Sequence, residues 1–233
     1  MKLQKETIRP EPAHGRWYDD ACGSAFGMEL LGERWTLLIL RELMFGPRRF
    51  TDLRADLPGI SAKILTERLA GMERSGILAR ITLSDPVPAQ VYQLTPWGRS
   101  AEPILQEIGR WAAASPLHDP TLPLSAASFI MSLRTMLDRH AAAGLSLTVA
   151  ITIGGSSFGL RLEQACLEVT RGLPDAADLV FEADAAPRMA ALFYGKVAPE
   201  TVGVTCRGAA CDLRRFMDLF NLPEKSAPPN VAD

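Results

Sequence analysis

The sequence is short of the residue types that most often mark a chemical site. Its 233 residues include four cysteines and three histidines, and aromatic side chains make up 7% of the chain. The cysteines show no CxxC or similar paired spacing, so the sequence predicts neither a zinc site nor a disulfide framework. We expect them to be reduced thiols, most of them buried as small hydrophobic residues. They are Cys22, Cys166, Cys206 and Cys211.

The chain also lacks the short motifs of the common enzyme classes. No GxGxxG, GxxxxGK(S/T), GxSxG or HExxH segment occurs, and His14, His118 and His140 stand apart from one another. The run GGSS at residues 154–157 is more typical of a hairpin turn than of a phosphate-binding loop. We therefore expect a protein that is not an enzyme and that holds neither a cofactor nor a metal.

No long, purely apolar run is present. The uncharged stretch at residues 141–160 is long enough to span a bilayer, but glycines and serines interrupt it. The N-terminus is polar and has no apolar core typical of an export signal. These features predict a soluble cytoplasmic protein without a membrane partner.

Charge and proline content divide the chain in two. The net charge is only −2, yet residues 34–80 carry nine basic and five acidic side chains. Pro116, Pro120 and Pro123 follow one another closely and disfavour both helix and central strand. We expect a boundary near residue 118, with domains at residues 17–115 and 125–223 and a disordered tail at 226–233.

The first half has the pattern of a winged helix-turn-helix domain. Apolar spacing predicts helices ending at Gly32 and Met44 and a short helix at residues 49–57. Ser61 is placed as an N-cap of a helix that runs to about Ser75. Strands are expected at residues 77–83 and 91–94, joined by a proline-bearing hairpin tip. Thr95 and Pro96 then open one more helix, which carries Ile104, Ile108 and Trp111 on one face.

These segments resemble the HxlR-type DNA-binding domain, a relative of the MarR repressors. The resemblance covers about residues 17–115 and depends on several motifs in combination. They are ELLGERWTLLILREL at residues 29–43, GPRRF at 46–50, Leu53, PGIS at 58–61, LTERL at 65–69, Gly76, YQLT at 92–95 and Gly98.

The resemblance implies that the helix after Ser61 is the recognition helix and enters the major groove of DNA. Lys63 and Thr66 lie nearest its N-terminal end and are the best candidates for base contacts. Arg68 falls beside the apolar stripe, which indicates a phosphate contact or an internal ion pair. The alternative for this whole face is ordinary solvation. The candidate DNA-binding residues are Arg48, Arg49, Ser61, Lys63, Thr66, Arg68, Arg80 and Gln90.

Cys22 matches a position at which some relatives carry an oxidant-sensing thiol. Relatives usually have proline next, whereas this chain has Gly23. A helix N-terminus would lower the pKa of the thiol and make it more reactive. A redox role and a purely structural role therefore both stay open for Cys22.

The second half predicts an α+β domain with a mostly antiparallel sheet. Helices are expected at residues 126–143, 187–194 and 213–220, and strands at 146–153, 158–162, 165–170, 178–183 and 201–206. This order resembles a sterol carrier protein-like domain, which implies an apolar ligand between sheet and helices. Core packing is the alternative for the side chains that would line such a cavity. They are Phe129, Leu133, Met136, Met189, Leu192, Phe193, Phe216 and Phe220.

Together these features predict a one-component transcriptional regulator. We expect a homodimer that binds double-stranded DNA, pairs through residues 17–26 and the helix bearing Trp111, and responds to a small lipophilic effector. Two alternatives remain: a redox-responsive repressor acting through Cys22, and a lipid-binding or carrier protein.

Overall fold

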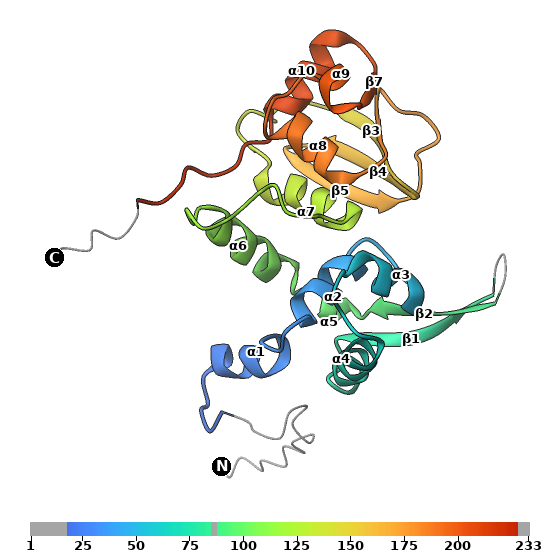
Figure 1. Ribbon diagram of the computed structural model, residues 1–233, viewed down its shortest axis with the longest axis vertical. Coiled ribbons are helices and arrows are strands. Elements are labelled where there is room, and N and C mark those ends of the chain that lie inside the picture. The colour runs from blue at the N-terminus through green and yellow to red at the C-terminus, as the bar shows by residue number, and fades with distance from the viewer. Residues whose placement is uncertain (1–17, 85–87, 228–233) are drawn as a thin grey trace. The chain divides into compact units, whose positions relative to one another are not determined.

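The computed structural model describes residues 18–84 and 88–227, and the chain forms two compact units (Figure 1). The first is Met1–Ser100 and the second is Ala101–Asp233. The division therefore falls ahead of the proline-rich segment near residue 118. As a result, the last helix of the expected DNA-binding domain belongs by its contacts to the second unit.

The first unit has the element order of a winged helix. Four helices precede a two-stranded antiparallel sheet in which Leu78 pairs with Leu94 and Leu83 with Ala89, and a short helix follows. The elements are α1 (Gly23–Leu31), α2 (Thr36–Leu43), α3 (Phe50–Asp56), α4 (Ala62–Arg74), β1 (Leu78–Leu83), β2 (Ala89–Leu94) and α5 (Pro96–Arg99). The winged helix-turn-helix fold is confirmed, although the tip of the hairpin at residues 85–87 lies outside the described residues.

The predicted caps fix the ends of α4 and the start of α5. The Ser61 hydroxyl accepts a hydrogen bond from the backbone N–H of Ile64 at 3.2 Å, as an N-cap does. Gly76 has a φ of +72°, the left-handed conformation that ends many helices. The Thr95 hydroxyl accepts from the N–H of Gly98 at 3.0 Å and donates to the Gly76 carbonyl at 2.7 Å. The wing is thereby tied at its base to both flanking helices.

Close packing at Gly98 explains why no larger residue fits there. A Cβ atom at this position would lie 2.0 Å from the Ile77 carbonyl oxygen, far inside contact distance. The core that this junction closes is mainly aliphatic. Its buried side chains come from α2, α3, α4 and the two strands of the wing, and they include Ile39, Leu40, Leu53, Leu65, Leu69, Leu78 and Leu94.

The single helix expected after Thr95 is in fact two helices. Helix α5 ends at Arg99, and α6 (Glu102–Ala113) begins after a short break. Pro103 explains the interruption, because it has no N–H to donate to the Arg99 carbonyl and so cannot continue the helical ladder. The break coincides with the division between the two units.

The second unit contains a five-stranded sheet in the order β5-β4-β3-β6-β7. The pairs β3–β4, β4–β5 and β6–β7 are antiparallel and β3–β6 is parallel, so the expected mostly antiparallel α+β architecture is confirmed. The strands are β3 (Leu147–Ile153), β4 (Ser156–Glu163), β5 (Cys166–Arg171), β6 (Leu179–Ala183) and β7 (Thr205–Arg207).

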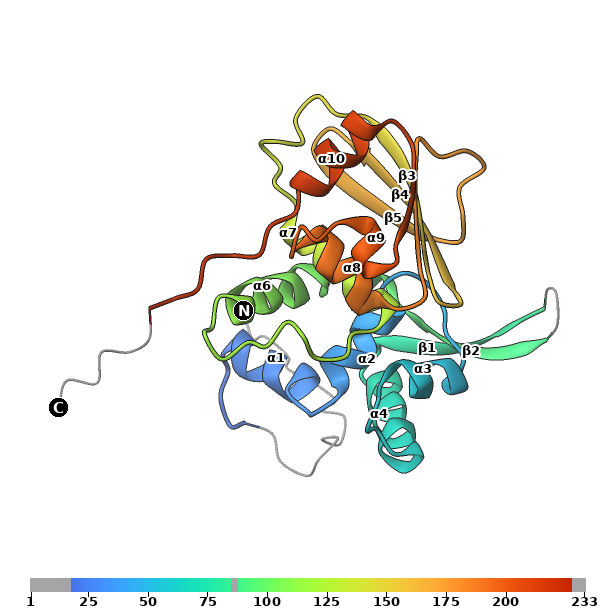
Figure 2. The same cartoon turned by 45° about the horizontal axis from the view of Figure 1, so that its top comes forward.

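Three helices cover one face of this sheet: α7 (Ala126–Met136), α8 (Ala186–Phe193) and α10 (Ala210–Asp218) (Figure 2). Their inward side chains form an aromatic cluster with the sheet. The ring of Phe193 lies 5.1 Å from Phe181, 5.5 Å from Phe129 and 5.7 Å from Phe220, measured between centroids. The interior of this unit therefore combines edge-to-face and tilted phenylalanine rings with aliphatic side chains such as Val149, Ile151 and Leu160.

Two predicted elements of the second unit differ from the structure. The helix expected at 126–143 ends at Met136, because Leu137 is extended and pairs with Phe220 in an isolated bridge. The strand expected at 201–206 is a short helix, α9 (Pro199–Val202), followed by β7. Pro199 at the helix start and Gly203 with a φ of +67° set these limits.

Part of the tail expected to be disordered is held in place. The N–H of Ser226 donates to the Ala114 carbonyl at 2.8 Å, while residues 228–233 lie outside the described residues. In the described part of the chain, no helix has the length and apolar content needed to cross a membrane.

Candidate nucleic-acid interface

Helix α4 presents a polar face to solvent because its apolar stripe is fully used in the core. Leu65, Leu69 and Met72 are buried, as the helical spacing predicts. On the other side, the exposed residues include Lys63, Thr66, Glu67 and Arg74. One face of α4 therefore packs against the core, and the opposite face is exposed to solvent.

Lys63 and Thr66 lie on this free face near the N-terminal end of α4. The Lys63 side chain is 84% exposed, and its ammonium lies 4.0 Å from the Glu67 carboxylate, the limit of an ion pair. The Thr66 hydroxyl donates to the Ala62 carbonyl at 2.9 Å, which leaves its oxygen able to accept a further hydrogen bond. Both side chains can reach a partner without disturbing the fold.

Arg68 forms an internal ion pair, one of the two alternatives left open by its position. Its guanidinium lies 2.5 Å from the Glu33 carboxylate and donates to the Arg34 carbonyl at 3.2 Å. The side chain is 20% exposed. Because Glu33 and Arg34 precede α2, Arg68 ties α4 to the corner between α1 and α2.

The backbone of that corner is left-handed at Trp35, which the local sequence pattern does not predict. Trp35 has a φ of +83°, a left-handed conformation that costs energy in a bulky residue. The Arg34 guanidinium lies 5.2 Å from the centre of the Trp35 ring, in cation–π contact. Arg68 thus binds the Glu33 carboxylate and the Arg34 carbonyl directly before this left-handed residue, and the adjacency of Glu33 and Arg34 in the sequence was the available signal.

The two arginines before α3 have different environments. Arg48 is 13% exposed, forms an ion pair with Asp56, and exchanges two backbone hydrogen bonds with Tyr92 of the wing at 2.8 and 3.0 Å. Arg49 is exposed and occupies the N-cap position of α3. In this structure Arg48 joins α3 to the wing, and Arg49 faces solvent.

The wing carries the remaining two candidates on its exposed surface. Arg80 of β1 pairs in register with Tyr92, and Gln90 of β2 pairs with Thr82. Both Arg80 and Gln90 are exposed. They lie on opposite strands and at different distances from the tip, so each can reach a separate point on a partner.

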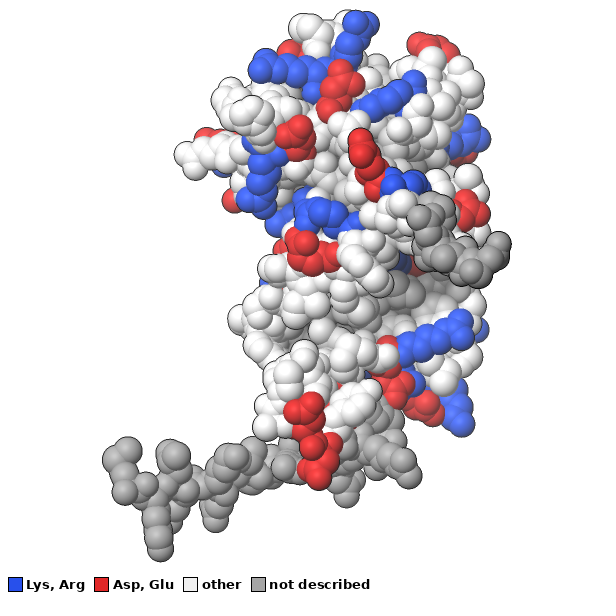
Figure 3. Space-filling model, turned by 90° about the vertical axis from the view of Figure 1, so that its left-hand side faces the viewer, with Lys and Arg blue, Asp and Glu red and all other residues white. Residues whose placement is uncertain are grey.

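Arg34 and Arg99 of the first unit have no ion-pair partner among the described residues, and neither do four further exposed arginines, namely Arg49, Arg54, Arg74 and Arg80. These four belong to α3, α4 and the wing, the elements that a winged helix presents to DNA. Arg54 was not among the predicted site residues, and the local excess of basic charge was the signal for it. On the face drawn in Figure 3, by contrast, acidic and basic side chains are interspersed.

None of the four cysteines is buried, which contradicts the expectation that most are small core residues, and Cys22 is an exposed thiol at the N-cap position of α1. Its sulfur lies 2.9 Å from the Ser24 hydroxyl oxygen. Hydrogen bonds from the side chain and backbone of Ser24, and from the backbone of Ala25, lower the pKa of the thiol below its ordinary value. This arrangement favours the thiolate, the reactive form of cysteine.

The residues expected to line a ligand cavity in the second unit form its hydrophobic core. All of them except Met136 are buried, and the four phenylalanines are fully buried and contact one another. Tyr194 joins this layer through its hydroxyl, which lies 2.7 Å from the Ser132 hydroxyl, and burial raises the pKa of Tyr194. The structure brings the predicted residues together as packed side chains.

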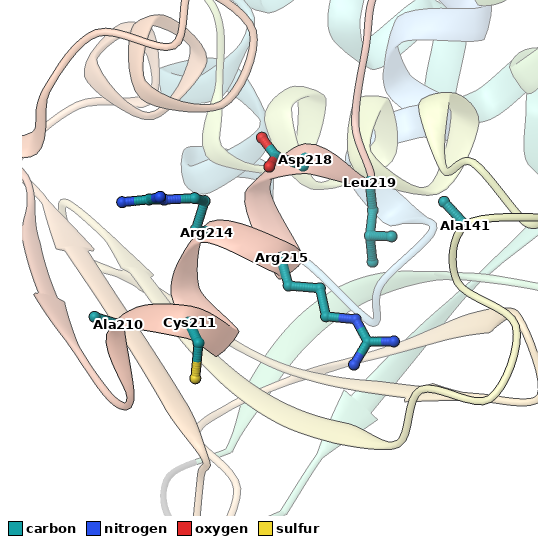
Figure 4. Close-up of a pocket in the computed structure, with 7 residues that line it drawn as sticks. All are labelled: Ala141, Ala210, Cys211, Arg214, Arg215, Asp218 and Leu219. Carbon is teal, nitrogen blue, oxygen red and sulfur yellow. The ribbon is translucent and has the colours of Figure 1, made fainter.

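A separate surface hollow of 680 Å³ lies along α10 (Figure 4). It is lined by one face of that helix and by the turn after α7, namely Ala141, Ala210, Cys211, Arg214, Arg215, Asp218 and Leu219. Arg214 and Arg215 point in different directions (Figure 4), so they do not converge on one ligand atom. None of the predicted ligand-binding residues lines this hollow.

Comparison with known proteins places the first half of the chain in a family. The family described as HxlR-like helix-turn-helix matches residues 30–118. The transcriptional regulator YvaP of Bacillus subtilis is 36% identical over 85 residues, which are 36% of this chain and 79% of YvaP. The regulator YodB of the same organism is 40% identical over 89 residues, 38% of this chain and 78% of YodB.

A solved structure of reduced YodB is 34% identical and covers 43% of this chain and all of that protein, with a TM-score of 0.39. These relatives are transcriptional regulators and not enzymes. The segment of this chain that is similar to these regulators contains α2, α3, α4 and the β1–β2 wing. Through residues 30–118, the chain belongs to the HxlR family of helix-turn-helix transcriptional regulators.

Proposed function

We propose that this regulator binds double-stranded DNA with α4 in the major groove and the β1–β2 wing against the flanking backbone. The observation that carries the proposal is the exposed face of α4, with Lys63 and Thr66 at its capped end. The major groove of B-DNA admits an α-helix and displays a distinct set of hydrogen-bonding groups for each base pair. An ammonium and a hydroxyl at the leading end of the helix suit that readout.

The proposal assigns different tasks to the basic residues. Arg49, Arg80 and Gln90 are exposed and contact phosphates, which fix position on DNA without reading its sequence. Arg48 and Arg68 are paired inside the unit and hold α3, α4 and the wing in register. Ser61 acts through its cap, which fixes where α4 begins.

We further propose that the protein binds DNA as a homodimer. Helix α6 carries an apolar face on which Ile104, Ile108 and Trp111 are 50%, 43% and 79% exposed. These residues recur at the helical spacing i, i+4 and i+7, and a second copy of the same helix could cover them. The matching operator is an inverted repeat with half-sites about 34 Å, one helical turn, apart.

The second unit is assigned a sensor role, in the sterol carrier protein-like manner that its element order resembles. A small lipophilic effector would enter between the sheet and the helices bearing Phe129, Met189 and Phe216. Because these side chains fill the space themselves, the effector must displace rings from the cluster to bind. It regulates only if it favours one arrangement of the protein over another.

Cys22 supports a second candidate function, a redox response. The exposed position of its thiol and its lowered pKa favour reaction with oxidants or electrophiles. Alkylation of the thiol, measured with and without peroxide treatment alongside DNA affinity, distinguishes this function from effector sensing. A Cys22→Ser variant that keeps the full peroxide response would exclude it.

The test of the proposed function is a DNA-binding titration over a range of salt concentrations. We expect log affinity to fall linearly with log salt, with a slope of about −0.9 for each phosphate contacted. Native mass spectrometry of the purified protein would identify any co-purified lipophilic molecule. Tight lipid binding without DNA binding would instead make the protein a lipid carrier.

A further inference from the structure

Within the second unit, one face of helix α6 packs against α7. At its first turn, the Glu102 carboxylate pairs with the Arg134 guanidinium of α7 at 2.9 Å, and both groups are mostly buried. Near its end, the Arg110 guanidinium donates to the Thr135 carbonyl at 2.6 Å. Gly109 lies between these contacts, where an added Cβ would lie 4.0 Å from the Thr135 side chain. The face opposite carries the exposed apolar residues described above.

The C-terminal tail secures the far end of the same helix. The Lys225 ammonium donates to the carbonyls of Ala113, Ser115 and His118, at 3.0, 3.0 and 3.4 Å. Ser226 adds two bonds to the Ala114 carbonyl, from its N–H at 2.8 Å and its hydroxyl at 3.2 Å. The last carbonyls of a helix have no partner within it, and they carry partial negative charge that a cation stabilises.

The tail begins in the second unit. It starts just beyond α10, after Phe220, whose backbone pairs with Leu137 at the end of α7. Residues 221–227 then reach the end of α6, although more than a hundred residues separate them in the chain. The other end of α6 follows α5, the short helix after the wing, with only Ser100 and Ala101 between them.

We propose that residues 221–227 form a latch that fixes the end of α6 to the rest of the second unit, and that α6 transmits the state of that unit to the DNA-binding unit. The latch holds α6 through the hydrogen bonds from Lys225 and Ser226. This inference deepens the proposed function, on which its DNA-binding consequence rests. It assigns Lys225 as a positioning residue, because the side chain acts on DNA binding only through the helix that it caps.

The chain contains a matched control for Lys225. The Lys196 ammonium caps the end of α10 in the same manner, donating to the carbonyls of Met217 and Phe220 at 2.8 and 3.2 Å. Burial lowers the pKa of Lys196, and Asp218 beside it partly offsets this effect. Helix α10, unlike α6, does not follow the DNA-binding unit in the chain, so a lost cap there should stay local.

The experiment compares the full-length protein with its Lys225→Met and Lys196→Met variants. Amide hydrogen exchange is measured on α6 and α10, and affinity is measured for a duplex selected by the wild-type protein from a random-sequence library. Exchange at the end of α6 should become about 2- to 5-fold faster in Lys225→Met, the size of effect expected from one charged cap. In Lys196→Met the same change should appear in α10 only.

Affinity for the selected duplex should fall by about the same factor in Lys225→Met and stay unchanged in Lys196→Met. Unchanged exchange in α6 of Lys225→Met would refute the latch. Faster exchange in α6 with unchanged affinity would refute transmission through α6. Failure of the wild-type protein to select any duplex would refute the proposed function, while the exchange data would still decide whether the latch exists.

Discussion

The two units use their side chains in opposite ways. In the winged-helix unit, the core is aliphatic and several arginines on α3, α4 and the wing have no ion-pair partner among the described residues. In the second unit, the core also contains a cluster of phenylalanine rings, and several cations are paired with carboxylates, as in Arg134–Glu102 and Arg207–Glu182. The first unit therefore has unpaired cations at its surface, and the second unit has its phenylalanine rings in its interior.

This comparison separates what each unit can do. Unpaired surface cations cost little stability and are suited to a polyanionic partner. A buried ring cluster contributes stability and shape, but it meets a ligand only if the rings move. Substitutions in the ring cluster should accordingly affect stability, and substitutions of the exposed cations of the first unit should affect DNA affinity.

The largest effect is expected from the ring cluster. Phe193→Ala removes a fully buried ring that contacts Phe129, Phe181, Phe216 and Phe220, and it should lower the free energy of unfolding by about 3–5 kcal/mol. Urea unfolding measures the loss. Amide exchange should rise in the sheet of the second unit and in α6, but not in α2 or α4. Equal acceleration in α4 would contradict the separation of the two units.

A smaller effect, on binding alone, is expected from the recognition helix. Lys63→Ala should weaken DNA binding by about 1–3 kcal/mol and change the preferred site, because a base contact is lost. Its stability should change by less than about 0.5 kcal/mol, since the side chain is exposed. Arg161→Ala removes an exposed cation from the second unit and is the matched control. An equal loss of affinity in the control would show that only overall charge matters.

The third prediction distinguishes a supporting arginine from a contacting one. Arg68→Gln breaks the pair with Glu33 and should lower both stability and DNA affinity by about 1 kcal/mol. The dependence of log affinity on log salt should keep its slope. Arg80→Gln should instead reduce that slope by about 0.9, as expected for one lost phosphate contact. A reduced slope in Arg68→Gln would mean that Arg68 contacts DNA directly.

The smallest effect concerns pH. Burial raises the pKa of Glu102 above its ordinary value of 4.5, and the Arg134 charge offsets part of this effect. The folded protein therefore holds the proton more tightly than the unfolded chain between these two pKa values, so this carboxyl makes stability fall as pH rises through that interval. In Glu102→Gln this part of the decline should be absent. Identical pH profiles for the two proteins, measured by urea unfolding, would show that Glu102 is not buried against α7.

The sequence predicted the features that depend on neighbouring residues. The Ser61 cap, the left-handed Gly76 and the Thr95 cap each involve groups within a few positions or an obligatory backbone geometry, and all three are present. Pro103 is a local signal too, and it accounts for the division of the helix expected after Thr95 into α5 and α6. The end of α7 at Met136 depends on a bridge to Phe220, which lies far along the chain.

Long-range pairing limited the prediction of the site in the same way. The partners of Arg68 lie before α2, and those of Lys225 lie at the end of α6, so both are distant in the sequence. The local pattern could therefore indicate an ion pair for Arg68, but it could not identify Glu33 as the partner. The parallel pairing of β3 with β6 is likewise non-local. Lys63 and Thr66 were identifiable because their exposure follows from the helical period of α4 alone.

The central claim is that the exposed face of α4 reads duplex DNA, and a salt titration of wild type and Lys63→Ala on one selected duplex tests it most directly. The account predicts a linear decrease of log affinity with log salt for both proteins, with Lys63→Ala weaker by about 1–3 kcal/mol at every salt concentration. Absence of duplex binding by the wild-type protein at low salt, or equal affinity of the two proteins, would contradict it.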